Sequence, residues 1–171
     1  MRRPAWWKGA RGEWYVVAQF TLFGLIALAP FVPGQPAWST PSSMPWVVAS
    51  YLLVMARGAG LLLGLAGAML AMAGLFGLGP NLSVLPHPKD DASLVQGGAY
   101  ALVRHPIYAG LIQGAFGWGL LTNSWLALAG GLALLLLFDF KARREEAWLA
   151  ARFPGYREYQ RRVRKFLPFI Y

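Results

Sequence analysis

The chain has 171 residues, of which 57% are hydrophobic and only 13% charged, whereas a soluble domain usually carries about 25% charged residues. Its apolar residues come in runs without a polar face, so a soluble core cannot hide them and lipid is the expected solvent. Sixteen Lys and Arg against seven Asp and Glu give a net charge of +9. In such an apolar chain we expect the basic residues to flank spans and meet anionic lipid, and we expect no nucleic-acid partner.

The first predicted span covers residues 14–32, close to the ~20 residues that cross a bilayer core. It follows basic residues, as in a signal peptide. However, it is long for a signal sequence and no small-residue cleavage site follows, so we interpret it as retained. Segment 33–45 holds prolines and no charge, which predicts a non-cytoplasmic loop. An aromatic belt at the start of the span is formed by Trp6, Trp7, Trp14 and Tyr15.

The next apolar stretch, residues 46–79, is interrupted by Arg57 and is too long for one straight span. We expect residues 46–56 to form an interfacial or re-entrant piece, because they are too short to cross alone, and residues 58–78 to form the second span. Glycines four residues apart let helices approach closely in lipid. Such pairs are Gly60 with Gly64 and Gly110 with Gly114.

A polar stretch and then a helical hairpin follow. Residues 81–104 contain prolines and a glycine pair, which predict a loop with broken helix at most. Two apolar segments with almost no link come next, residues 106–121 and 125–140, and they predict a tight hairpin of two spans. Pro106 suits the first turn of its helix, where a missing N–H costs nothing.

The C-terminal tail is charged from Lys141 onward. Trp148 and Leu149 give its first part an apolar side, and residues 153–155 break it. A second amphipathic piece, residues 156–166, is rich in arginine and predicts a helix lying on the membrane surface.

The distribution of charge predicts the topology. Nearly all charge lies in the N-terminal segment, in loop 80–104 and in the tail 141–171, and a four-span count places all three on the cytoplasmic side, whereas a five-span count does not. We therefore predict an all-α polytopic membrane protein with about four transmembrane helices, a C-terminal helical hairpin and a cytoplasmic amphipathic tail. The whole chain, 1–171, is expected to form one membrane domain, with N-terminal spans in residues 1–80 and the polar loop, hairpin and tail in residues 81–171.

The two cytoplasmic ends of the hairpin must be adjacent. Taken one at a time, the residues at these ends have simpler interpretations. Arg104 could be a membrane anchor and His105 a helix cap. Glu145 and Glu146 could form an ordinary solvated face, paired with Lys141 at a four-residue spacing. Their convergence favours a functional site, because ionisable residues at a membrane edge are expensive. The topology brings together Arg104, His105 and Tyr108 from the start of the hairpin with Lys141, Glu145 and Glu146 from its end.

Several kinds of chemistry have no pattern in the sequence. There is no cysteine, and two histidines are too few for a metal cluster without carboxylates, so we predict no metal site. No serine, histidine and acid are spaced as in a hydrolase, and no Walker or Rossmann fingerprint occurs. Arginine and histidine can hold a carboxylate or phosphate, and glutamate can hold a ribose hydroxyl or an ammonium, which suits a zwitterionic or phosphorylated cofactor.

Residues 98–110 read Gly-Ala-Tyr-Ala-Leu-Val-Arg-His-Pro-Ile-Tyr-Ala-Gly, and an apolar hairpin and Glu145-Glu146 follow. This order resembles the pattern of the integral membrane methyltransferases, which include the isoprenylcysteine carboxyl methyltransferases and the phospholipid N-methyltransferases. The ending Leu-Pro-Phe-Ile at residues 167–170 is similar to that of the isoprenylcysteine enzymes. The resemblance covers residues 94–170, nearly half of the chain.

The resemblance implies S-adenosylmethionine as methyl donor. A substrate-facing arginine of the family falls on Lys141, with Arg144 one turn further on, and the implied catalytic residues are Arg104, Lys141 and Glu146. The family often has a histidine at the position of Ala92, and here His87 lies five residues earlier. Carried over by position, the cofactor-binding residues are Ser93, Leu94, Val95, Tyr100, His105, Pro106, Ile107, Tyr108 and Glu145.

The implied reaction is direct in-line methyl transfer to a lipophilic small-molecule or prenylated acceptor at the membrane, most like isoprenylcysteine carboxyl methylation. A carboxylate or thiolate acceptor needs no general base, whereas an amine must lose a proton, with Glu146 as the candidate base. Phospholipid N-methylation and thiol S-methylation therefore stay open, and the oligomeric state is not predicted. Two further alternatives are an NADPH-dependent sterol-type reductase, which is a much longer protein, and a non-catalytic membrane structural protein.

Overall fold

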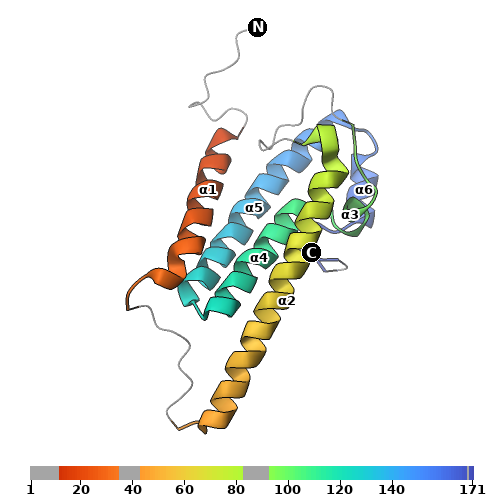
Figure 1. Cartoon of the computed structure of the whole chain (residues 1–171). Coiled ribbons are helices and arrows are strands. Elements are labelled where there is room, and N and C mark those ends of the chain that lie inside the picture. The colour runs from red at the N-terminus through yellow and green to blue at the C-terminus, as the bar shows by residue number, and fades with distance from the viewer. Residues whose placement is uncertain (1–11, 35–42, 83–92, 169) are drawn as a thin grey trace.

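The computed structural model describes residues 12–34, 43–82, 93–168 and 170–171 (Figure 1). These residues are almost entirely helical, and an isolated parallel bridge joins Val103 to Arg164, so the predicted all-α class is confirmed. The α-helices are α1 (Glu13–Leu28), α2 (Trp46–Leu78), α3 (Ala99–Leu102), α4 (Pro106–Thr122), α5 (Trp125–Arg152) and α6 (Tyr156–Arg162), with 3-10 turns η2 (Ala29–Phe31) and η3 (Gly79–Asn81).

The long helices are apolar around their whole circumference. Three stretches of the described chain are long and apolar enough to cross a membrane: Glu13–Phe31, Trp46–Asn81 and Trp125–Arg152. Met69 and Phe76 of α2 are 74% and 78% exposed, as expected for side chains that face lipid. α4, with 17 residues, packs along α2 and beside α5. The four-span count includes α4 as a span and stays a prediction.

The division of residues 46–78 into two pieces is wrong. α2 is one continuous helix of 33 residues, Trp46–Leu78, and Arg57 lies within it. This part of the chain contains no proline, and arginine is a good helix former, so nothing in the backbone ends the helix at residue 57. At 1.5 Å per residue, a helix of this length extends for roughly 50 Å, and its first part projects beyond the other helices (Figure 1).

Glycines form the seam between α2 and α4. Gly60, Gly67 and Gly74 recur every seven residues and are the buried residues of α2. A methyl group on Gly67 would lie 2.5 Å from the carbonyl oxygen of Gly110, and one on Gly60 would lie 2.7 Å from that of Gly117. The close approach expected from the glycine pairs is therefore present at Gly60 and Gly110, whereas a methyl group on Gly64 or Gly114 meets nothing within 4 Å.

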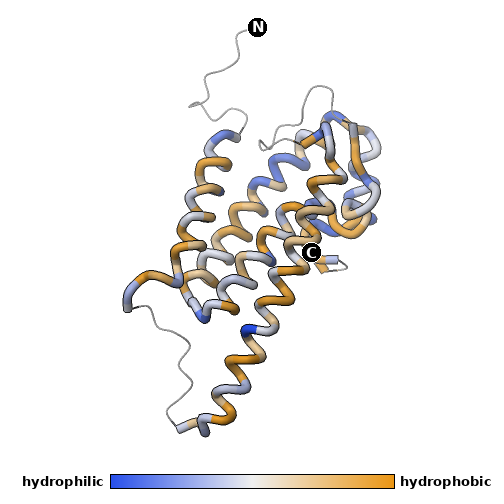
Figure 2. Tube along the Cα trace, viewed as in Figure 1, coloured by the Kyte–Doolittle hydropathy of each residue, from blue (hydrophilic) through white to orange (hydrophobic). Residues whose placement is uncertain are grey.

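α4 and α5 form the predicted hairpin. Asn123 ends α4 in the left-handed conformation, and the Ser124 side chain caps α5 by accepting a hydrogen bond of 3.2 Å from the Ala127 amide. α5 continues through the charged segment to Arg152, where the predicted break at residues 153–155 follows. The start of α1, the end of α2, the start of α4 and the end of α5 lie at the same end of the bundle, where hydrophilic residues gather (Figures 1 and 2).

The tail differs from the predicted surface helix over residues 156–166. α6 ends at Arg162, and residues 163–166 run extended along the start of α4, with the Val103–Arg164 bridge in parallel. Tyr156 and Tyr159 are buried, because the tail packs on α3 and the hairpin rather than lying free. Phe166 belongs to the core cluster with Val103, Leu134 and Phe138.

Candidate functional site

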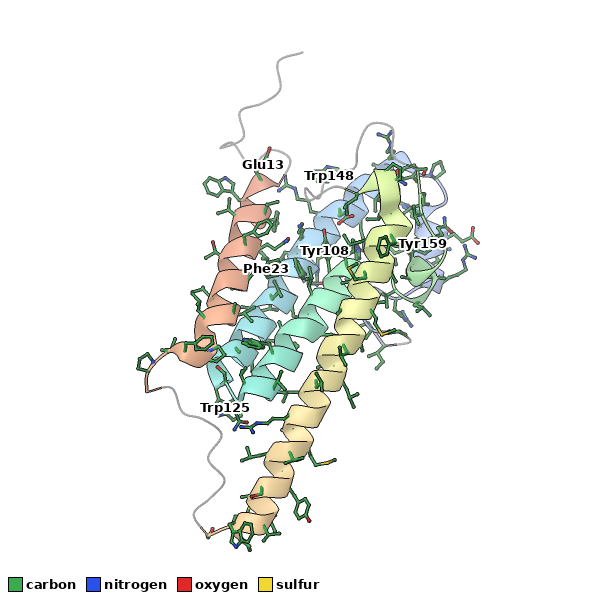
Figure 3. The ribbon with its side chains drawn as sticks, in the orientation of Figure 1. Glu13, Phe23, Tyr108, Trp125, Trp148 and Tyr159 are labelled. Carbon is green, nitrogen blue, oxygen red and sulfur yellow. The ribbon has the colours of Figure 1, made fainter. Side chains whose placement is uncertain are left out.

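A cavity of about 270 Å³ lies at the hydrophilic end of the bundle, among α1, α2, α4, α5 and α6. Figure 3 shows Tyr108 near the centre of this end and Tyr159 on the side of α6. The polar residues that line it are Gln19, Asn81, Ser93, Tyr100, Arg104, His105, Tyr108, Lys141, Glu145, Tyr156 and Tyr159. The apolar residues that line it are Phe20, Leu75, Leu78, Leu82, Leu94, Val95, Ile107, Leu111 and Leu149.

Glu146 is the centre of a buried polar network. Its Oε1 accepts a hydrogen bond of 2.9 Å from Arg104 Nε and lies 3.0 Å from His105 Nε2. Its Oε2 accepts a hydrogen bond of 2.8 Å from Gln160 Nε2. Arg104 also donates to the backbone carbonyls of Gln160, at 3.1 Å, and of Val163. Both oxygens of this carboxylate are therefore occupied by groups of the protein.

His105 is the N-cap residue of α4, but its side chain makes no cap hydrogen bond. Instead its ring stacks on Tyr108, with centroids 5.3 Å apart and planes 3° from parallel, and Tyr108 stacks in turn on Phe138 at 4.6 Å. The Tyr108 hydroxyl donates to Glu145 Oε2 at 2.9 Å. Glu145 is thus oriented by Tyr108 and lines the cavity, while Glu146 supports His105 from behind.

Lys141 is 1% exposed and joins α5 to α1. Its Nζ donates a hydrogen bond of 2.7 Å to Gln19 Oε1 and lies 5.1 Å from the centre of the Tyr108 ring. The salt bridge expected between Lys141 and Glu145 along the helix is replaced by these contacts. A buried ammonium is expensive unless it is bonded, so the Gln19 oxygen and the aromatic ring stabilise it here.

The tail fixes the backbone at the start of α4. Arg104 N donates to Arg164 O at 2.8 Å, and His105 N donates to Lys165 O at 3.1 Å. The Lys165 ammonium is anchored on Asp139 Oδ1 at 2.6 Å, which also accepts from the Tyr171 hydroxyl at 2.7 Å. The extended tail segment therefore holds the two site residues in place from outside the cavity.

The remaining wall joins the end of α2 to the loop and to α6. Asn81 bonds to both the amide and the hydroxyl of Ser93, at 3.0 and 3.2 Å. The Tyr100 hydroxyl donates to Gly74 O at 3.3 Å, and the Tyr159 hydroxyl donates to Tyr100 O at 2.6 Å. Burial raises the pKa of Tyr159 to about 12, so this hydroxyl stays protonated and acts as a donor.

The predicted convergence of the two hairpin ends is confirmed by the distances above. Three of the residues named from the sequence do not line the cavity: Pro106 is fully buried in the first turn of α4, Glu146 lies behind His105, and Arg144 lies 5.2 Å from the Trp148 ring. His87 and Ala92 lie outside the described residues. The named residues that line the cavity are Ser93, Leu94, Val95, Tyr100, Arg104, His105, Ile107, Tyr108, Lys141 and Glu145.

Some lining residues were missed from the sequence. Gln19 is the clearest, because a polar side chain inside a predicted span is a signal that could have identified it. Asn81 at the end of α2 is a second polar example, and Gln160 completes the Glu146 network from the tail. Within the described part of the chain, no group of three His, Cys, Asp or Glu side chains is placed to hold a metal ion.

Comparison with known proteins identifies the class. Residues 55–155 match the phospholipid methyltransferase family, so the chain belongs to this family of integral membrane methyltransferases, and the predicted superfamily is confirmed. The solved structure of the eukaryotic intramembrane Ras methyltransferase, isoprenylcysteine carboxyl methyltransferase, has a similar fold. The TM-score is 0.61 at 24% sequence identity, over 95% of this chain and 67% of that chain. The protein is thus an integral membrane protein.

Two relatives illustrate the breadth of the similarity. The chain is 34% identical over 159 residues to the cobalt-zinc-cadmium resistance protein CzcN of Cupriavidus metallidurans. This alignment covers 92% of this chain and 62% of that protein. It is 29% identical over 156 residues to the protein-S-isoprenylcysteine O-methyltransferase of Homo sapiens. This alignment covers 89% of this chain and 52% of that protein. The chain therefore spans between half and two thirds of the length of these relatives.

Proposed function

We propose that the protein is an S-adenosylmethionine-dependent methyltransferase that acts on a lipophilic acceptor at the membrane. The observation that carries this proposal is the cavity itself. Its lining combines apolar side chains, many of them from the membrane helices, with His105, which the Glu146 network orients, and with Tyr108 and Glu145, which are bonded to each other. A water-soluble cofactor and a lipid-like acceptor could meet in such a space.

The chemistry of the donors and acceptors suits this cofactor. Glu145 presents a carboxylate that can accept from a ribose hydroxyl or an ammonium, and it is held in place by Tyr108. Arg104 and His105 line the same end and can bind a carboxylate. Ser93 to Val95 supply a wall that is braced by Asn81. When bound, S-adenosylmethionine supplies a methyl group already activated on a positively charged sulfur.

The role of the protein is then to position reactants and to exclude water. Lys141 lines the same cavity as Glu145, so its ammonium can orient an anionic acceptor group. Gln19 holds this ammonium from α1. With the cofactor bound, Lys141 would hold an acceptor carboxylate toward the methyl group, and transfer to that carboxylate would give a methyl ester and a neutral thioether without releasing a proton.

The Glu146 network bears on the choice of acceptor. A general base needs a free oxygen that reaches the proton it removes. Both oxygens of Glu146 are bonded to Arg104, His105 and Gln160, and the residue does not line the cavity. We therefore assign Glu146 to positioning His105 and Arg104. This assignment favours an acceptor that is already anionic, such as the carboxylate of an isoprenylcysteine, over the amine of a phospholipid.

The proposed orientation follows from the same arrangement. The hydrophilic end of the bundle, with the site and the tail, is placed on the cytoplasmic side, where a soluble cofactor enters. The acceptor then enters from the lipid. A prenylated protein or a small prenylated thiol carrying a carboxylate has the required amphipathic character.

Isothermal titration of the detergent-solubilised full chain with S-adenosylmethionine tests the cofactor. We expect saturable binding by the wild type and its loss in the double variant His105→Ala, Glu145→Ala. The double variant Arg152→Gln, Arg157→Gln, which removes two exposed charges outside the cavity, serves as the matched control and should bind normally. Absence of wild-type binding, or full binding by the first double variant, contradicts the proposal.

A further inference from the structure

The outer side of the tail carries a second cavity, of about 280 Å³, that shares no residue with the site described above. Arg161, Arg162 and Arg164 line it, and none of the described residues that line it is acidic. Leu102 and Pro168 complete its rim. Three arginines around one hollow make the site strongly positive, and the Glu146 network and the proposed reaction make no use of their side chains.

The backbone beneath these arginines is held firmly. Arg104 donates to the carbonyls of Gln160 and Val163, and the Arg104 amide donates to Arg164 O at 2.8 Å. Lys165 is buried and its ammonium binds Asp139, whereas Arg164 is exposed and lines the second cavity. The cavity is thus built by the same tail segment that holds the start of α4.

The charges of the arginines are only weakly compensated. Arg162 lies 3.9 Å from Glu158, but both side chains are mostly exposed, and an ion pair of this kind contributes little. Arg161 and Arg164 are also exposed. Apolar side chains stand next to this charge: Leu102 on the rim is 59% exposed, and Leu167 beside Pro168 is 46% exposed.

We propose that this cavity binds the headgroup of an anionic phospholipid. Guanidinium groups match the oxygens of a phosphodiester in a forked geometry, and Leu102 and Leu167 would contact the glycerol and the first acyl carbons. A free phosphate ion would leave these apolar side chains uncovered, which is why we assign the site to a lipid. Because the chain is an integral membrane protein, bilayer lipid is always at hand.

Native mass spectrometry of the full chain in detergent measures this binding without any methyl transfer. The probes are short-chain phosphatidylglycerol and phosphatidylcholine at equal concentrations. We expect the wild type to retain phosphatidylglycerol preferentially, and the double variant Arg161→Gln, Arg164→Gln to weaken this binding roughly ten-fold or more, since each arginine near an anionic lipid surface strengthens the attraction. The control Arg152→Gln, Arg157→Gln removes the same charge outside the cavity and should leave the preference intact.

A third variant guards against a folding defect. Arg164→Lys keeps the charge but loses the fork, and we expect it to reduce phosphatidylglycerol retention while the melting temperature in phosphatidylcholine stays that of the wild type. Equal retention of the two lipids by the wild type overturns the proposal, as does unchanged retention in the cavity variants. Complete competition by millimolar inorganic phosphate would also overturn it, because it would identify an ion site.

Discussion

The α2–α4 seam and the hydrophilic end of the hairpin are held together by different forces. Along the seam, Gly67 and Gly110 bring two backbones into direct contact. At the hydrophilic end, Glu146 collects hydrogen bonds from Arg104, His105 and Gln160, which come from different parts of the chain. The two regions meet on α4, because Gly110 lies in its second turn and His105 is its N-cap residue.

The difference reflects the solvent. Lipid is as apolar as leucine, so burying leucine between helices gains little in a membrane, and close van der Waals contact decides where helices meet. At the membrane edge, buried charges must be paired or they cost several kcal/mol, so the network there is specific but vulnerable. The seam should therefore respond to added volume, and the hydrophilic end to lost charge.

The largest expected effect comes from Glu146→Ala. It leaves Arg104 and His105 without their shared carboxylate, and breaking a buried pair costs about 3–5 kcal/mol. We expect cofactor binding to be lost and the start of α4 to loosen, which hydrogen exchange at residues 104–110 would measure. The substitution of the neighbouring acid, Glu145→Gln, removes a carboxylate from the cavity but leaves the Glu146 network intact. It should therefore weaken cofactor binding without changing the hydrogen-exchange protection of residues 104–110. Equal protection in Glu146→Ala and the wild type would contradict the distinction between the two acids.

Gly67→Leu should produce the next largest effect. Its first side-chain carbon would meet the Gly110 carbonyl at 2.5 Å, so α2 and α4 must separate, and overpacking of this kind costs about 1–3 kcal/mol or more. Gly64→Leu is the matched control, because a methyl group there meets nothing within 4 Å. Thermal unfolding in detergent should show a lower melting temperature for Gly67→Leu alone. A similar loss in both variants would mean that the seam does not run through Gly67.

The smallest effect of the three is expected for Asp139→Asn. This change weakens the anchor of Lys165, whose carbonyl bonds to His105, and a hydrogen bond to a charged group contributes about 1.5–3 kcal/mol. We expect the cofactor affinity to fall, because the anchor positions His105, which we assign to the cofactor. The acceptor KM should not change, because the anchor does not contact Lys141. Arg143→Gln removes the exposed partner of the same carboxylate and should have little effect. A rise in acceptor KM without a change in cofactor affinity would contradict the positioning role of the tail.

The sequence predicts the hydrophilic end well. Composition identifies the membrane class, and the short link at residues 122–124 forces the two hairpin ends together, so the proximity of His105 and Tyr108 to the acidic pair follows from topology. Which acid pairs with which residue is given by the structure alone. The order of residues 98–110 before the acidic pair leads to the same family as the comparison with known proteins. Local pattern and chain connectivity are sufficient for these features.

Other features depend on contacts between distant segments. Arg57 suggested a break, but no local signal ends the helix, and α2 continues. The pattern at residues 156–166 is amphipathic and predicts one surface helix. In the structure the tyrosines of this segment are buried, with Tyr159 bonded to the Tyr100 carbonyl, and the helix ends at Arg162. The bond between Gln19 and Lys141 joins residues 122 positions apart and has no sequence pattern. Tertiary packing overrode the local helical pattern in the tail, whereas α2 follows its local helix propensity.

The most direct test of the central claim is a methyl-transfer assay with S-adenosylmethionine labelled on its methyl group. The acceptors are a farnesylated cysteine derivative with a free carboxylate, its pre-formed amide, and phosphatidylethanolamine. The account predicts label on the free carboxylate alone, as an ester that base releases as methanol, and loss of this label in Lys141→Met with cofactor binding retained. Label in phosphatidylethanolamine, or on the amide as readily as on the carboxylate, would contradict it.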